Sequence, residues 1–274
     1  MSKIRRAASA AKSMFDPAQH RAELDRFRRL NNKLERTVAR LEKRALAGKP
    51  GLPADMDEEA REIIRLVRPY TMTSAEKVFA LITAVRHVAR VNLPGDFVEC
   101  GVWRGGSVHA VARTLVNLGI TDRELHLFDT FTGMTEPTER DRRGDTSAAD
   151  LLQRADKSQN VWAIASLEDV KEGVAALDYP QERFHFVQGP VEETIPGSAP
   201  ETIALLRLDT DWYESTKHEL EHLYDRLVPG GVLIMDDYGS WQGAKEATDE
   251  YMATLDNPPM MTRAGRGRIG IKPA

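Results

Sequence analysis

The sequence predicts an α/β fold in which helices cover both faces of a mostly parallel, Rossmann-like sheet. Three observations predict this class. Apolar strand-like runs alternate with helical patterns from residue 96 onward, and strands joined by helices run parallel. Glycines follow the first of these runs, and acidic residues follow several others. Ligands of such sheets bind at the carboxyl ends of the strands.

The individual elements follow from hydrophobic spacing and from breaks at glycine and proline. Apolar residues at helical spacing predict helices over 57–67, 74–91, 105–118, 166–177, 214–227 and 241–255. Short apolar runs predict strands over 96–102, 124–131, 183–188, 203–209, 231–236 and, as an edge strand, 268–272. The polar stretch 132–160 is expected to be either a flap over a site or a solvated loop.

The chain divides into an N-terminal extension and a main domain. Residues 1–56 are expected to form a helical extension and a linker, followed by a helical lead-in over 57–93 and a sheet core over 94–274. A stripe of apolar residues at spacings of three and four recurs in the extension: Leu24, Phe27, Leu30, Leu34, Val38 and Leu41. Such a stripe is compatible with a coiled coil that builds a homo-oligomer or with a helix packed on its own domain.

The composition excludes several classes of protein. The formal net charge of −4 argues against a nucleic-acid partner, because binding nucleic acid normally requires a basic face. The single cysteine, Cys100, excludes an internal disulfide and a cysteine-based zinc site. No apolar run reaches the ~18 residues that span a bilayer, and no secretory signal is seen at the start. We therefore expect a cytoplasmic protein without a membrane partner.

The loop after the first strand points to a nucleoside ligand. It contains Gly101, Gly105 and Gly106, and glycines there let a ligand approach the backbone closely. The spacing is not that of dinucleotide enzymes, and Glu99 would repel a pyrophosphate while suiting a ligand with an ammonium group. Asp129 ends the second strand, where an acid can bind ribose hydroxyls. The turn at 188–191 is a plausible adenine rim, so the three strand ends together favour an adenosyl ligand.

Four carboxylates follow two other strands. Asp209 and Asp211 end one strand, and Asp236 and Asp237 end the next. If the two strands are neighbours, the carboxylates meet at one rim of the sheet. Asp209 and Asp211 would point to the same side if the strand continues that far. Such a concentration of negative charge requires a cation or protons, and oxygen-only ligands suit Mg²⁺, with Mn²⁺ or Ca²⁺ as alternatives.

These motifs resemble a known family. Segments 97–107, 127–133, 208–212, 227–232 and 236–239, with 70–74 upstream, closely resemble the macrocin O-methyltransferase family. Its members methylate sugars in macrolide and aminocoumarin antibiotic pathways. The resemblance runs from about residue 68 to 252. It implies a class I methyltransferase fold, S-adenosylmethionine as methyl donor, and Mg²⁺, with Mn²⁺ as an alternative. It also implies a sugar or glycosylated natural product as acceptor, with a glycan or nucleotide sugar equally open.

The resemblance also implies roles for individual residues. Asp209, Asp236 and Asp237 match the metal-binding acids, and Asp211 matches the general base. The residues implied to bind the donor are Met72, Thr73, Ser74, Glu99, Gly101, Ser107, Asp129, Thr130, Gln188, Gly189, Val191 and Asp209.

Two enzyme alternatives remain open on the sequence. His218, Glu219 and His222 match the H-E-x-x-H pattern of zinc metallopeptidases. The helix carrying them must turn its leucines inward, so the histidines are expected at the surface or flank. The second alternative is an NAD-dependent oxidoreductase. The glycine spacing and Glu99 argue against it. His109 is also expected to be a surface or flank residue.

Overall fold

The computed structural model describes residues 52–157 and 159–274. The apolar stripe of residues 24–41, and with it the proposed coiled coil, lies outside the described residues. The predicted boundary at residues 56 and 57 coincides with the start of the first described helix, which Asp57 caps through its side chain. The division into domains stays a prediction.

The core of the protein is a seven-stranded sheet of strand order β5-β2-β1-β6-β7-β9-β8. Its strands are β1 (Asp96–Cys100), β2 (Leu125–Asp129), β5 (Phe184–Gln188), β6 (Ile203–Leu208), β7 (Leu227–Met235), β8 (Thr262–Ala264) and β9 (Gly267–Ile271). The first five in spatial order are parallel, and β9 and β8 are antiparallel to their neighbours. The predicted α/β class is confirmed.

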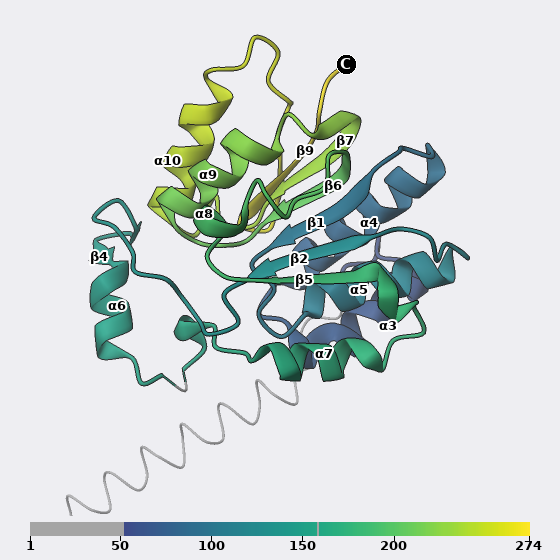
Figure 1. The fold of residues 1–274 in the computed structure, drawn as a ribbon, viewed down its shortest axis with the longest axis horizontal. Coiled ribbons are helices and arrows are strands. Elements are labelled where there is room, and N and C mark those ends of the chain that lie inside the picture. The colour runs from purple at the N-terminus through teal and green to yellow at the C-terminus, as the bar shows by residue number, and fades with distance from the viewer. Residues whose placement is uncertain (1–51, 158) are drawn as a thin grey trace, which may run out of the picture. The chain divides into compact units, whose positions relative to one another are not determined.

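Helices cover both faces of this sheet (Figure 1). One layer contains α3 (Glu58–Val67), α4 (Ala75–Arg90), α5 (Gly106–Asn117) and α7 (Leu167–Ala175). The other contains α8 (Val191–Thr194), α9 (Tyr213–Leu223) and α10 (Gln242–Met252). Serine side chains cap α4 and α7 by accepting a hydrogen bond from the first turn, which satisfies a backbone donor that the helix leaves free. The core between the layers consists mainly of branched aliphatic side chains from the parallel strands.

Two predictions for the C-terminal part of the chain are wrong, one in where a helix ends and one in which strand forms the edge of the sheet. The helix predicted over 214–227 ends at Leu223, and Leu227 instead begins β7, where it pairs with Ile203 of β6. The predicted edge strand, β9, pairs on both sides because β8 folds back against it. The strand β8 is therefore the edge.

The polar stretch 132–160 is more ordered than either expectation for it. It contains a small hairpin of β3 (Arg142–Arg143) and β4 (Thr146–Ser147), followed by α6 (Ala148–Arg154). The hairpin strand β3 packs against α10, and α6 lies apart from the central sheet (Figure 1). A folded substructure of this kind presents side chains at set positions.

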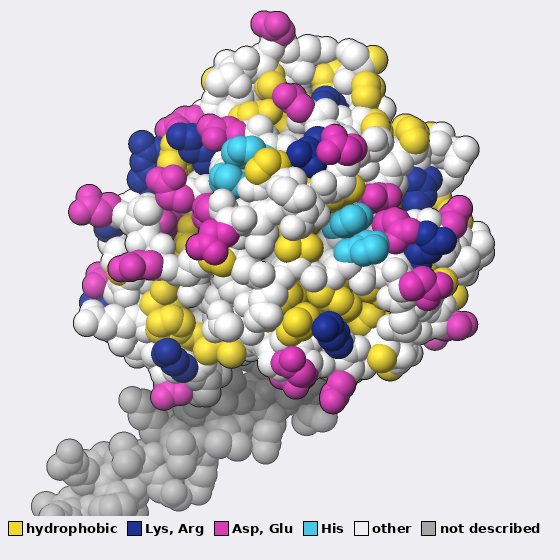
Figure 2. Space-filling view, in the orientation of Figure 1, with side chains coloured by type: hydrophobic (Ala, Val, Ile, Leu, Met, Phe, Trp, Pro, Cys, Tyr) yellow, Lys and Arg dark blue, Asp and Glu magenta, His cyan; other side chains and the backbone are white. Residues whose placement is uncertain are grey.

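The surface is mixed in charge on the face shown in Figure 2, where acidic and basic side chains are interspersed. The net charge is −4, and basic side chains do not gather into a patch on this face. Neither observation supports nucleic-acid binding. No helix within residues 52–157 and 159–274 is long and apolar enough to cross a bilayer.

Candidate active site

A cavity of about 400 Å³ opens at the carboxyl ends of the parallel strands. It brings together most of the residues singled out in the sequence. Its lining includes Met72, Thr73, Gly101, Asp129, Thr130, Gly189, Val191, Asp209, Asp211, Asp236 and Asp237. Lining residues that the sequence did not single out include Lys77, Trp103, Arg143, Glu192 and Trp241.

Three carboxylates form the centre of this cavity. Asp209 follows β6, and Asp236 and Asp237 follow β7. Each offers an oxygen atom within 4.8 Å of the others. The two strand ends are held together because the Asp236 amide donates to the Leu208 carbonyl at 2.9 Å. Neighbouring parallel strands thus produce the predicted cluster.

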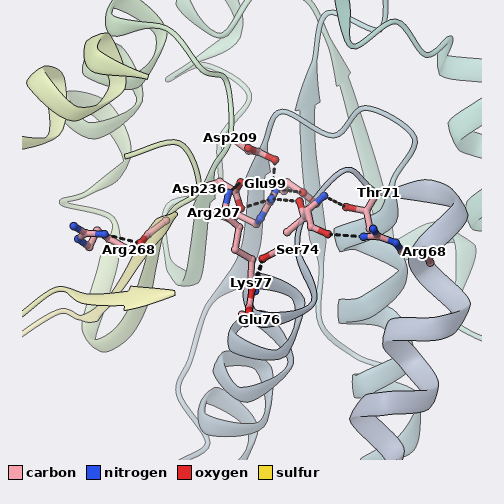
Figure 3. A network of polar contacts seen from close by, with 12 residues as sticks. Arg68, Thr71, Ser74, Glu76, Lys77, Glu99, Arg207, Asp209, Asp236 and Arg268 are labelled. Carbon is pink, nitrogen blue, oxygen red and sulfur yellow. Dashed lines mark hydrogen bonds and ion pairs between the residues drawn. The ribbon is translucent and has the colours of Figure 1, made fainter. Parts of the chain in front are cut away.

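Two cations that the sequence analysis missed hold one side of the cluster (Figure 3). The Arg207 guanidinium lies 2.7 Å from Asp209 and 2.8 Å from Asp236. It also donates to Thr73 at 3.3 Å, and Lys77 of α4 pairs with Asp236. Arg207 was visible in the sequence as one charged residue inside an apolar strand, but its partners depend on the sheet order.

The carboxylates of the cavity still outnumber these two cations. Burial raises the pKa of Asp209 and of Asp237 well above the usual range, and neighbouring carboxylates add to the shift. Against the effect of burial, Arg207 and Lys77 lower the pKa of Asp236. Among the described residues, Asp237 Oδ2 is buried without a hydrogen-bond partner. An oxygen-only set with crowded acids and an orphan oxygen fits a hard divalent cation.

Asp211 reaches the cavity by a different route from the one expected. The strand β6 ends at Leu208, and Asp211 has a φ of +70°, so strand alternation does not place it on the same side as Asp209. Both nevertheless line the cavity. Burial, with the nearby Asp209 charge, raises the pKa of Asp211 to about 7, which suits a group that takes up a proton near neutral pH.

The glycine-containing loop is held by Asp129. Its Oδ2 atom accepts hydrogen bonds from the amides of Val102 at 2.7 Å and Trp103 at 2.9 Å. Gly101 has a φ of +86°, and a Cβ atom there would lie 2.1 Å from the Asp209 carbonyl oxygen. The absence of a side chain at Gly101 therefore lets the loops after β1 and β6 come together.

Four of the predicted donor-binding residues do not line the cavity. Glu99 is buried and paired with Arg207 at 2.6 Å, so its charge is compensated. The expectation that Glu99 repels a pyrophosphate and attracts an ammonium group required an uncompensated carboxylate, and therefore does not hold. Ser74 caps α4, and Ser107 is buried in the first turn of α5. Gln188 is exposed and donates to the Thr130 carbonyl at 3.4 Å.

The histidine motif on α9 does not form a zinc site among the described residues. The two rings are stacked with centroids 4.1 Å apart, and each uses one nitrogen on a backbone carbonyl, that of Ile195 or of His218. Glu219, which a zinc peptidase would need near the metal, is fully buried. The described residues that could hold a metal as a group of three are Asp209, Asp236 and Asp237.

The strand order and the cavity at the carboxyl ends of the strands define a class I methyltransferase fold, and comparison with known proteins gives the family. The chain belongs to the macrocin O-methyltransferase (TylF) family, whose family model matches residues 18–262. It is therefore an O-methyltransferase, as the sequence predicted, and the oxidoreductase alternative receives no support.

Individual relatives agree with this assignment. The chain is 34% identical over 187 residues to the demethyldecarbamoylnovobiocin O-methyltransferase of Streptomyces niveus, covering 68% of this chain and 69% of the relative. It is 35% identical over 202 residues to a tetracenomycin 4'-O-methyltransferase of Streptomyces olivaceus that acts on a dimethoxyrhamnosyl compound, covering 74% and 69%. The solved structure of the O-methyltransferase NovP superposes with a TM-score of 0.66 at 32% identity, covering 75% of this chain and 83% of that one.

Proposed function

We propose that this enzyme transfers a methyl group from S-adenosylmethionine to a sugar hydroxyl, with Mg²⁺ bound at the carboxylate cluster. The single observation that carries the proposal is that the cluster and the glycine-containing loop line one cavity. The adenosyl donor and the acceptor hydroxyl can therefore be held side by side. Proximity of this kind provides much of the rate enhancement in a transfer reaction between two bound substrates.

The donor side of the cavity supports this proposal. Asp129 ends β2. Its Oδ2 atom binds the two loop amides and its Oδ1 atom accepts from the Phe131 amide at 2.7 Å, which leaves a lone pair of Oδ1 to accept from a ribose hydroxyl. Gly189 and Val191 line the cavity next to it, where an adenine ring would lie. Thr73 and Met72 close the cavity from the segment before α4.

The carboxylate cluster supports the acceptor side. A divalent cation held by Asp209, Asp236 and Asp237 would polarise a hydroxyl group and lower its pKa. Asp211 lines the same cavity and is the residue that we assign as the general base. It accepts the proton of the acceptor hydroxyl, and the oxygen freed of that proton attacks the methyl carbon as the bond from carbon to sulfur breaks.

The sugar acceptor is proposed from the relatives and not from the geometry. The name of the tetracenomycin enzyme specifies a rhamnosyl group, and a Micromonospora griseorubida relative, 31% identical over 182 residues, is named a mycinamicin III 3''-O-methyltransferase. The rhamnosyl group in the first name supports a sugar hydroxyl of a natural product as the acceptor. The homo-oligomer and the cytoplasmic location stay predictions.

Calorimetric titration with S-adenosylhomocysteine tests the donor. We expect one site per chain, and no binding of NAD⁺ under the same conditions. If protein that is verified to be folded does not bind S-adenosylhomocysteine, the donor assignment is overturned.

A second titration, with Mg²⁺ or with Mn²⁺ followed by electron paramagnetic resonance, tests the metal. The variant Asp237→Asn should bind the ion at least ~10-fold more weakly, because it loses a charged ligand. The matched control is Asp225→Asn, an exposed acid outside the cavity. Equal metal binding by both variants would remove Asp237 from the metal site.

A further inference from the structure

Arg143 is a cation on the cavity wall without an acidic partner. Two basic residues line the cavity among the described residues, Lys77 and Arg143. Lys77 is paired with Asp236, whereas the exposed side chain of Arg143 has neither an ion pair nor a hydrogen bond to any residue in 52–157 or 159–274. Its neighbours differ, because Arg140 pairs with Glu250 at 3.1 Å and Arg142 donates to the Asp145 carbonyl at 2.6 Å.

The guanidinium group of Arg143 is held in a set orientation by Trp241. Its Cζ atom lies 4.2 Å from the centroid of the indole ring. Trp241 is itself buried and packs edge-on against Trp212, with centroids 4.9 Å apart. Stacking on an aromatic face leaves the N–H groups at the edge of a guanidinium free, and these match the two oxygens of a phosphate or carboxylate.

The hairpin that carries Arg143 is anchored to the body of the enzyme. Asp141 is fully buried, and its carboxylate accepts from the Tyr213 amide at the start of α9 and from the Thr138 amide, both at 2.7 Å. A Cβ atom at Gly243 of α10 would lie 2.0 Å from this carboxylate, so glycine makes room for the anchor. Arg143 follows the anchor by two residues and pairs with Thr146 across the hairpin.

We propose that Arg143 binds an oxyanion carried by the acceptor, so that the acceptor is an anionic sugar compound. This inference rests on the proposed function, since it concerns the acceptor of the same cavity. The four carboxylates of Asp209, Asp211, Asp236 and Asp237 would repel an anionic acceptor from the cavity. A stacked and unpaired guanidinium on the wall supplies the attraction that such an acceptor requires. The oxyanion is the diphosphate of a nucleotide sugar or the carboxylate of a uronic acid.

The test compares three probes that differ in charge. UDP-glucose, methyl glucuronide and methyl glucoside are each titrated into full-length protein in the presence of S-adenosylhomocysteine and Mg²⁺. We expect UDP-glucose or methyl glucuronide to bind more tightly than the neutral glucoside, and the tighter of the two identifies the oxyanion. The variant Arg143→Gln should weaken that binding roughly 10- to 100-fold, as the loss of a charge-assisted, two-point hydrogen bond requires. Arg143→Lys should fall between, because lysine keeps the charge without the planar fork.

Arg154→Gln is the matched control, since Arg154 is an exposed arginine of the same segment on α6 that does not line the cavity. It should bind all three probes as the wild-type protein does, and both variants should keep wild-type affinity for S-adenosylhomocysteine. Equal affinity for the three probes, or an Arg143→Gln variant with unchanged affinity, would overturn the inference. If the wild-type protein does not bind S-adenosylhomocysteine, the proposed donor is contradicted instead. The three probes titrated without S-adenosylhomocysteine would then still test whether Arg143 binds the oxyanion.

Discussion

Glu219 is a carboxyl group that should make the enzyme less stable. It is fully buried in α9, and neither of its oxygens has a hydrogen-bond partner among the described residues. Burial raises its pKa well above 4.5, and the nearby Thr210 hydroxyl only partly opposes this, because its geometry falls short of a hydrogen bond. We predict that Glu219→Gln, which removes the charge and keeps the shape, stabilises the protein at neutral pH.

The sign of the pH dependence follows from the raised pKa. The folded state binds the proton more tightly than the unfolded state, so the penalty is absent below pH 4.5 and grows as the pH rises toward the folded pKa. The growth cannot exceed ~1.4 kcal/mol per pH unit for one group. At pH 7.5 we expect a gain of roughly 1–4 kcal/mol for the variant, where the upper limit is this slope taken over the interval from pH 4.5 to pH 7.5.

Thermal unfolding of the wild-type protein and the variant at pH 5 and at pH 7.5 measures this difference. Each kcal/mol corresponds to about 2–4 °C in Tm for a domain of this size. Glu221→Gln is the control, because Glu221 is an exposed glutamate on the same helix, and it should change Tm little at either pH. A Glu219→Gln variant that is less stable than the wild type, or whose advantage is the same at both pH values, would refute the reasoning.

Three further predictions concern the cavity. Asp129→Ala should lower Tm as well as the affinity for S-adenosylhomocysteine. It leaves the two loop amides that donate to Asp129 without a partner, at a cost of roughly 1–3 kcal/mol each. An unchanged Tm would confine the role of Asp129 to ligand binding. Gly101→Ala should destabilise the fold by more than ~1 kcal/mol in urea unfolding, because its methyl group would lie 2.1 Å from the Asp209 carbonyl oxygen; a wild-type midpoint would contradict this. Burial places the pKa of Asp211 at about 7 without metal, and bound Mg²⁺ should lower it. Turnover with Mg²⁺ present should therefore rise about tenfold per pH unit at acid pH and level off above an inflection that lies below this value, because the base must be ionised. Turnover that stays flat down to about pH 4, the ordinary range of an aspartate, would exclude Asp211 as the base.

The fold class and the set of strand ends that build the cavity were predictable from the sequence. The parallel strands are apolar runs bounded by polar turns, a pattern that depends on neighbouring residues alone. Glycines and acids directly after those runs placed Gly101, Asp129, Asp209 and Asp236 at one edge of the sheet, since parallel strands all end on the same side.

The tertiary structure decided which charges meet. Lys77 and Arg207 lie 130 residues apart in the chain and share the Asp236 carboxylate only because α4 crosses the sheet beside β6. His109, expected at the surface or the flank of its helix, is buried against Tyr70 with ring centroids 4.5 Å apart, since α3 and α4 pack against its helix, α5. Local sequence patterns carry the conformation of each element, but the partner of a buried charge depends on elements brought together from distant parts of the chain.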